Sequence, residues 1–191
     1  MTHSTPRRYF SRPFASPVGR LRLIASDTGL AAILWENDKP GRVPLANLVP
    51  AATSNIMARG SEPDEHPVLV ETERQLGEYF AGTRTAFDLP LDPVGTEFQR
   101  RVWRALLAIP YGQTRSYADI ARQVGSPTAV RAVGAANGKN PISIVTPCHR
   151  VIGSTGQLAG FAGGLETKAY LLRLESPRRG SLKGPCAPSA A

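Results

Sequence analysis

The pattern of apolar residues predicts a β-hairpin followed by one helix in the first half of the chain. Residues 21–25 and 30–35 are short apolar runs, and the turn signal Asp27-Thr28-Gly29 lies between them, so they are expected to pair as strands. Pro67 suits a first helical position, and Gly82 suits a helix end. The positions between them that follow helical spacing are Leu69, Thr72, Leu76 and Phe80. Residues 1–9 are expected to be disordered, and the Pro- and Gly-rich stretch 37–66 to form a long loop or a weak strand.

Capping boxes predict where helices begin in the second half. Thr96 with Gln99 starts one helix, which Pro110 ends, and Ser116 with Asp119 starts another, which Gly125 ends. The residues expected to face the core are Phe98, Val102, Ala105, Leu106 and Ile109 in the first helix and Ile120, Ala121 and Val124 in the second. Ser126-Pro127 is expected to cap a third helix over residues 128–137. A last helix over residues 165–175 is expected to bury Leu165, Ala169 and Leu172.

The second and third of these helices, joined by a Gly-containing turn, form a candidate helix-turn-helix. Residues 129–136 are nearly all small, and Arg131 is their only long side chain. A reader of base edges in the major groove would carry Asn, Gln or several Arg here, so the pattern favours a binder of DNA backbone and shape with Arg131 as a wedge. The alternative is that this helix is buried in the protein interior and that its small side chains allow tight packing against other helices.

Three units follow from these elements. Phe87, Leu89 and Leu91 alternate with acidic residues, as in a short strand or an extended linker, and the chain changes character at residues 90–95. We therefore expect domains at 1–92 and 93–175, in a mixed α/β protein. Residues 176–191, which include Cys186, have no core-forming pattern and are expected to be a disordered tail.

Composition narrows the setting. The 191 residues contain no apolar window long enough for a transmembrane helix and no apolar segment near the N-terminus that would suggest a signal peptide. Two cysteines make no disulfide framework, which indicates a reducing, cytoplasmic compartment. The three histidines are scattered and give no ligand pairs at metal spacing, so no metal is expected.

The net charge of +8 is unevenly distributed. Residues 61–92 carry eight acids against two bases, whereas residues 97–150 carry eight bases against two acids. A basic half of this kind favours a polyanionic partner, nucleic acid first, with a solvated basic face as the alternative.

Candidate chemistry is concentrated at Cys148. It follows an apolar run that is expected to be a buried strand, and His149 and Arg150 come directly after it. A lone cysteine among apolar residues is commonly a small core residue, but neighbouring His and Arg favour a reactive thiolate. The glycine-rich loop 153–164 follows, and it could bring backbone N–H groups close to a flat ligand.

The sequence Pro147-Cys148-His149-Arg150 resembles the active-site motif of O6-alkylguanine-DNA alkyltransferases. The resemblance extends over residues 95–175, through Ile109-Pro110-Tyr111-Gly112, Arg131-Ala132-Val133-Gly134 and Asn140-Pro141, and is weaker over residues 9–92. It implies a ribonuclease-H-like N-terminal sheet with helices and a helical C-terminal domain that carries a winged helix-turn-helix. It also implies that the protein binds double-stranded DNA containing O6-alkylguanine, flips the damaged base out and transfers the alkyl group irreversibly to Cys148. No cofactor, membrane or obligate protein partner is implied, and cooperative assembly on DNA stays open.

The same resemblance assigns roles to individual residues. Cys148 is the acceptor, His149 the base through a water, and Glu175 the group that orients His149. Asn140 hydrogen-bonds into the site, and Tyr117 donates to guanine N3. The implied DNA surface comprises Arg131 as the finger with Thr128, Ala129, Ala132, Gly134 and Ala135, and the implied substrate pocket comprises Val151, Phe161, Ala162 and Gly163.

One position departs from the family pattern. Many members place Tyr-Ser where this chain has Phe161-Ala162, so a hydroxyl that could bond O6 is absent and a less polar, roomier pocket is expected. The alternative function is that of alkyltransferase-like proteins, which bind lesions without repairing them and lack the acceptor thiol. A papain-type hydrolase and a transcription factor with a structural thiol fit less well, because the first needs a separately placed His and Asn and the second a sensor domain.

Overall fold

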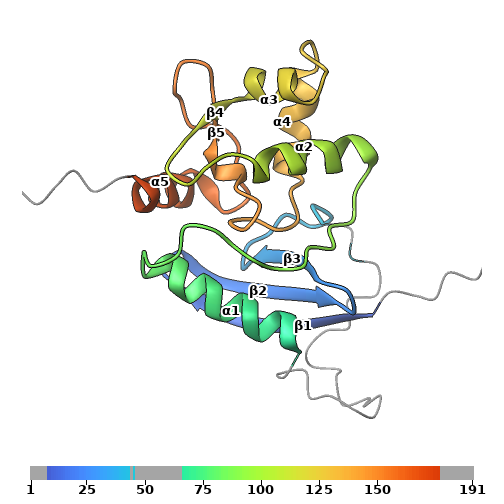
Figure 1. Ribbon diagram of the computed structural model, residues 1–191, viewed down its shortest axis with the longest axis vertical. Coiled ribbons are helices and arrows are strands. Elements are labelled where there is room, and N and C mark those ends of the chain that lie inside the picture. The colour runs from blue at the N-terminus through green and yellow to red at the C-terminus, as the bar shows by residue number, and fades with distance from the viewer. Residues whose placement is uncertain (1–7, 44, 46–65, 177–191) are drawn as a thin grey trace, which may run out of the picture.

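The computed structural model describes residues 8–43, 45 and 66–176 as a sheet with one covering helix, joined to a group of helices (Figure 1). The predicted tail, Cys186, and most of the predicted loop at 37–66 lie outside the described residues. Within the described ranges, no helix combines the length and the apolar composition needed to span a bilayer.

The N-terminal sheet has three antiparallel strands in the order β1 (Tyr9–Ser16), β2 (Gly19–Ser26) and β3 (Leu30–Trp35). The predicted hairpin of β2 and β3 is confirmed, with Leu23 opposite Ile33. Strand β1 was not predicted, because most of its residues are half-buried and carry no clear alternation. Its first residue, Tyr9, falls in the segment expected to be disordered, and that expectation is wrong at this position.

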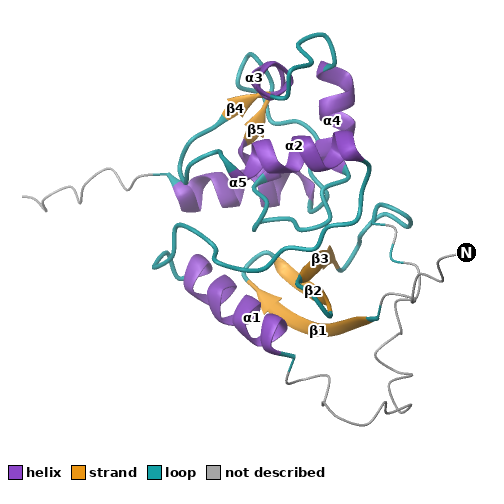
Figure 2. Ribbon diagram, turned by 45° about the vertical axis from the view of Figure 1, so that its right-hand side comes forward, coloured by secondary structure: helices purple, strands orange, loops and turns teal. Residues whose placement is uncertain are grey.

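Helix α1 (Pro67–Phe80) packs along the sheet and begins with the predicted proline (Figure 2). Its inward positions include the predicted Leu69, Thr72 and Leu76, and also Tyr79. Leu69, Leu76 and Tyr79 share one core with Leu23 and Ile33 of the sheet and with Ile142, Ile144 and Leu171 from the far end of the chain. Burial of apolar area is the main favourable contribution to folding, so this common core holds the two halves of the protein together.

The linker between the two halves is extended, as predicted, and lies against β3. The backbone N–H of Leu30 donates to Pro90 O at 2.7 Å, and the N–H of Asp92 donates to Leu30 O at 2.8 Å. Farther along the strand, Ile33 N–H donates to Pro141 O at 2.9 Å. The edge of β3 is thus paired with the linker at Pro90 and Asp92 and with Pro141 of the second half.

The second half contains α2 (Glu97–Leu107), α3 (Tyr117–Gln123), α4 (Val130–Gly138) and α5 (Gly164–Glu175). Both predicted capping boxes are present, with Thr96 accepting from Gln99 N–H and Ser116 from Asp119 N–H. Strand β4 (Arg115–Ser116) pairs in parallel with β5 (Val151–Ile152). Ile109, assigned to the first helix, is buried but lies beyond its end.

Two predictions about helices in this half are wrong. Helix α4 begins at Val130 rather than at Thr128, and its N-cap Ala129 has no side chain that could cap it. In α5 the inward residues are Lys168, Leu171 and Glu175, whereas Leu165 is 49 % exposed. Apolar periodicity misplaced this face because the buried lysine and glutamate are paired with groups that lie far away in sequence.

The predicted strand before Cys148 is also wrong. Residues 142–146 form a tight turn in which Thr146 N–H donates to Ile142 O at 2.9 Å, and Cys148–Arg150 form a single 3₁₀ turn. Ile144, fully buried, adopts φ +75°, a region that a β-branched residue rarely occupies. Such a conformation costs about 1–3 kcal/mol of conformational free energy, which packing in the surrounding core must offset.

Candidate active site

The turn that presents Cys148 is fixed by Asn140. Its side-chain amide donates to Thr146 O at 2.8 Å, and its Oδ1 accepts from Ile142 N–H at 3.1 Å, so one side chain ties both ends of the turn. Arg42 of the N-terminal half donates to the carbonyl of Asn140 from outside. These contacts hold the turn in place, and a role of Asn140 in the reaction stays a prediction.

Cys148 is almost fully enclosed, with 3 % of its surface exposed. Burial raises the pKa of the thiol, and this outweighs a hydrogen bond from Asn140 and the positive charges of Lys168 and Arg42, which favour the thiolate. The resting group is therefore a thiol, and it needs a base to become a nucleophile.

His149 is placed to be that base. Its Nε2 lies 2.7 Å from Glu175 Oε1, while its Nδ1 is buried and has no hydrogen-bond partner among the described residues. Burial lowers the pKa of His149, against the opposing influence of Glu175, so the imidazole is neutral near pH 7. A neutral ring that donates from Nε2 carries its lone pair on Nδ1, which is the state of a proton acceptor.

Glu175 is the anion on which this site is built. Burial by itself would raise its pKa, but hydrogen bonds from His149 and Arg150 bring the pKa down to about 2. Arg150 donates through Nε to Oε2 at 2.7 Å and through Nη2 to Oε1 at 3.0 Å. Its third donor, Nη1, donates to Ile109 O at 2.6 Å, so Arg150 anchors both backbone and carboxylate.

The glycine-rich loop closes over the same region. Phe161 lies edge-on to Trp35 at 5.4 Å and to His149 at 6.4 Å between ring centroids. A Cβ on Gly163 would lie 2.8 Å from the ring of Trp35, so the close approach of the loop to the N-terminal half requires glycine there. Val151, which pairs in β5, is fully buried behind the thiol, and Ala162 is half-buried in the loop.

Tyr117 and Lys168 hold this loop through one carbonyl. The hydroxyl of Tyr117 donates to Ala159 O at 3.1 Å, and Lys168 Nζ donates to Ala159 O and to Val151 O, each at 2.6 Å. Burial lowers the pKa of Lys168 to about 8. The apolar pattern does not indicate that this lysine is buried, and only the fold shows that it is one of the inward residues of α5.

The predicted DNA-facing residues lie on or next to α4, and all of them are exposed except Ala129 and Gly134, which are half-buried. Arg131, Ala132 and Ala135 are exposed, whereas Val133, Ala136 and Asn137 on the opposite side are buried in the cluster around Cys148. Asn137 Nδ2 donates to Cys148 O at 3.5 Å. One helix thus separates a solvent face from the nucleophile. Thr128 is exposed in the turn before it, and the ring of Tyr117 lies 3.9 Å from where a Cβ on Gly134 would be.

Positive charge is exposed on this half of the protein. Seven of the eight basic side chains within residues 97–150 are exposed: Arg100, Arg101, Arg104, Arg115, Arg122, Arg131 and Lys139. The eighth, Arg150, is buried on Glu175. The charge imbalance seen in the sequence is therefore mostly a surface property.

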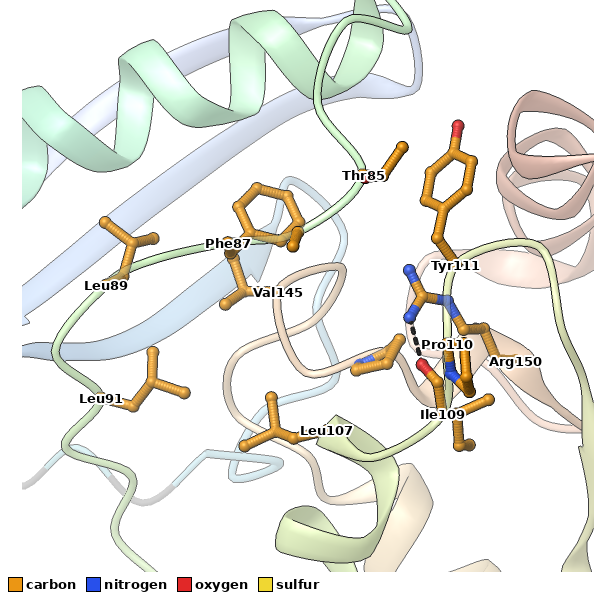
Figure 3. Close-up of a pocket in the computed structure, with 12 residues that line it drawn as sticks. Thr85, Phe87, Leu89, Leu91, Leu107, Ile109, Pro110, Tyr111, Val145 and Arg150 are labelled. Carbon is orange, nitrogen blue, oxygen red and sulfur yellow. Dashed lines mark hydrogen bonds between the residues drawn. The ribbon is translucent and has the colours of Figure 1, made fainter.

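A separate cavity of about 210 Å³ lies between the linker and the second half (Figure 3). Leu89, Leu91 and Leu107 line one part of it, and Tyr111 and Arg150 another. The Arg150 donors already bind Ile109 and Glu175, so this cavity offers no free charged group to a ligand. Among the described residues, no three His, Cys, Asp or Glu side chains come together in a way that would hold a metal ion.

Replacement of Lys168 by Met tests whether the buried amine loses its proton in the folded state. The pKa of Lys168 falls from its ordinary 10.5 to about 8 on folding, so between these pH values the unfolded chain binds more protons. The free energy of unfolding of the wild type minus that of Lys168→Met should therefore rise between pH 8 and 10.5. Denaturant unfolding at several pH values measures this difference. Lys139→Met, at an exposed position, is the control, and equal pH dependence in both variants would contradict the assignment.

Comparisons with known proteins agree with this geometry. The chain matches the ribonuclease-like domain of 6-O-methylguanine DNA methyltransferase over residues 10–93 and the DNA-binding domain over residues 97–177. A methylated-DNA–protein-cysteine methyltransferase of Methanosarcina acetivorans is 44 % identical over 162 residues, which are 85 % of this chain and 95 % of that one. A relative of the same name from Mycolicibacterium paratuberculosis is 66 % identical over 101 residues, 53 % of this chain and only 61 % of the relative's length.

Solved structures show the same likeness. A Mycobacterium tuberculosis O6-methylguanine methyltransferase is 40 % identical with a TM-score of 0.69, covering 90 % of this chain and 96 % of that one. Another structure, of a Mycobacterium tuberculosis protein in complex with DNA, is 43 % identical with a TM-score of 0.71, covering 89 % of this chain and 95 % of that one. The two matched domains span most of the sequence, and the chain belongs to the 6-O-methylguanine DNA methyltransferase family.

Proposed function

We propose that this protein repairs O6-alkylguanine in duplex DNA by transferring the alkyl group to Cys148 in a single, irreversible turnover. The observation that carries the proposal is the unpartnered Nδ1 of His149, next in sequence to a buried thiol, in a ring that Glu175 holds by its other nitrogen. Family membership supports the same reaction. Two chemical steps and one structural requirement follow from this arrangement.

The first step is activation of the sulfur. His149 takes the thiol proton, directly or through a water, and the imidazolium that forms is stabilised by the Glu175 carboxylate 2.7 Å away. The thiolate is soft and polarisable, which suits displacement at a saturated carbon. A new S–C bond forms as the C–O6 bond breaks, and the resulting thioether cannot be reversed by the site.

The second step is neutralisation of the leaving guanine. Tyr117 donates its proton to N3, as the family resemblance implies, so guanine leaves uncharged, and the phenolate regains a proton from the imidazolium of His149 through solvent. Burial raises the pKa of Tyr117, so its hydroxyl is protonated and able to donate. In the substrate-free protein that hydroxyl is bound to Ala159 O, and it must exchange this partner when the base occupies the pocket.

The structural requirement is that the alkylated base reaches Cys148. O6 is hidden in stacked DNA, and Cys148 is enclosed by the protein, so the base must leave the duplex and the loop must admit it. We assign the duplex contact to a winged helix-turn-helix formed by α3 and α4 with the short β4–β5 pair. Arg131 is assigned to fill the space that the extruded base leaves in the base stack. The proposed units are residues 1–92, 93–175 and a tail at 176–191. A cytoplasmic location stays a prediction, and cooperative assembly on DNA stays open.

A non-catalytic lesion-binding protein is the second candidate, and the presence of Cys148 with a paired base counts against it. Intact mass measurement after incubation with methylguanine duplex separates the two. The proposal expects one added CH₂ group per chain, mapped by peptide analysis to Cys148, and no addition in Cys148→Ser. Cys148→Ser should still bind the duplex. An unmodified wild type that is folded and DNA-bound would support the binding protein instead.

Arg131→Ala should slow transfer from duplex DNA about tenfold or more, because extrusion costs a few kcal/mol and a side chain that fills the vacated stack offsets part of it. Binding to undamaged duplex should weaken less. Arg122→Ala, an exposed arginine on α3, is the control for general loss of positive charge. Equal losses of transfer and of binding in Arg131→Ala would remove the flipping role.

The Phe161-Ala162 pair should make the pocket tolerant of bulky alkyl groups, since no serine hydroxyl is available to bond O6. Single-turnover rates on methyl- and benzyl-guanine duplexes should be similar in the wild type. Ala162→Ser should shift the preference toward methyl. A strict methyl preference in the wild type would refute this interpretation of the pocket.

A further inference from the structure

The N-terminal half places a tyrosine hydroxyl on the carboxylate of the proposed active site. Tyr79, in the last turn of α1, is 1 % exposed, and its hydroxyl donates to Glu175 Oε1 at 2.7 Å. The same oxygen accepts from His149 Nε2 at 2.7 Å. The two donors come from opposite halves of the protein and meet on one carboxylate oxygen.

We propose that Tyr79 is a positioning residue for alkyl transfer, which acts through Glu175 to set how readily His149 accepts a proton. This rests on the proposed function, in which His149 is the base. The N-terminal half is then part of the chemical machinery, in addition to being a structural support.

The direction of the effect follows from the number of donors on Glu175. Its two oxygens accept from Tyr79, from His149, twice from Arg150, and from Gly112 N–H at 3.4 Å. Each donor takes up part of the negative charge, and less remains to stabilise an imidazolium. Removal of one donor should therefore strengthen the hold of Glu175 on a protonated His149.

The remaining charges around the pair do not change this expectation. The titratable groups that face His149 and Glu175 come from α1, the loop before β4, the 3₁₀ turn and α5, and they are Tyr79, Tyr111, Cys148, Arg150 and Lys168. Burial raises the pKa of Tyr79, with Glu175 adding to it, so the phenol stays protonated and can only donate to the carboxylate. Removal of its hydroxyl changes no formal charge in the site.

The ring and the hydroxyl of Tyr79 have separable roles. The ring packs against Phe80 and Phe87, each at 5.4 Å between centroids, and against Tyr111 at 6.3 Å. Phenylalanine keeps this packing and removes only the donor. Tyr111 offers a matched control, because its hydroxyl donates to the backbone carbonyl of Leu174 at 3.1 Å, one residue before Glu175, and not to the carboxylate.

The test is a pH titration of His149 in the DNA-free protein. Its protonation is monitored by NMR of the imidazole nitrogens from pH 8 downward. Tyr79→Phe should move the midpoint upward by about half a unit to one unit, a roughly three- to tenfold change in the protonation equilibrium. The acid side of the pH–rate profile for methyl transfer should move by the same amount. Tyr111→Phe should match the wild type in both measurements.

If Tyr79→Phe fails to fold, 3-fluorotyrosine at position 79 replaces it. Its phenol is a stronger donor, so the His149 midpoint should move downward. The proposal would be overturned if the change at position 79 left the His149 midpoint unmoved or moved it in the opposite direction. An equal shift in Tyr111→Phe would overturn it as well. The titration needs no substrate, so its failure is distinct from failure of the wild type to accept a methyl group, which would overturn the proposed function.

Discussion

A single buried carboxylate organises this protein. Glu175 lies at the end of α5, is 1 % exposed, and accepts hydrogen bonds from Arg150, His149 and Tyr79. A charge removed from water is tolerated only where such donors replace it, and loss of one partner leaves the others uncompensated. The interaction that holds the C-terminal helix to the 3₁₀ turn and to α1 is therefore also the one that orients the proposed base.

Burial also determines the resting state of the proposed nucleophile. Burial keeps the Cys148 thiol protonated and the His149 imidazole neutral, so the resting pair carries no separated charge. The turn that carries them is strained at Ile144 and is held by Asn140, by Arg42 and by a core shared with the N-terminal sheet. Enclosure protects the thiol, and it also means that the loop held by Tyr117 and Lys168 has to yield when a base arrives.

Local signals in the sequence were enough for much of the fold. The hairpin, the start of α1 at Pro67 and both capping boxes depend on neighbours within a few residues, and all are confirmed. The sequence could not show what depends on distant partners: the turn at 142–146, the inward face of α5 with Lys168 and Glu175, or the hydroxyl of Tyr79 on a carboxylate 96 residues away. Family resemblance named Cys148, His149 and Glu175 together, and the structure brings His149 and Glu175 into contact.

The central claim is that the alkyl carbon ends on the protein and stays there. Duplex DNA with an isotopically labelled methyl group on guanine O6, supplied in large excess over protein, tests it by the distribution of label at completion. One equivalent of label per chain, stable on further incubation and absent from small molecules in solution, is the result expected. Label released as methanol, or more lesions removed than there are protein chains, would show hydrolysis or turnover and would contradict it.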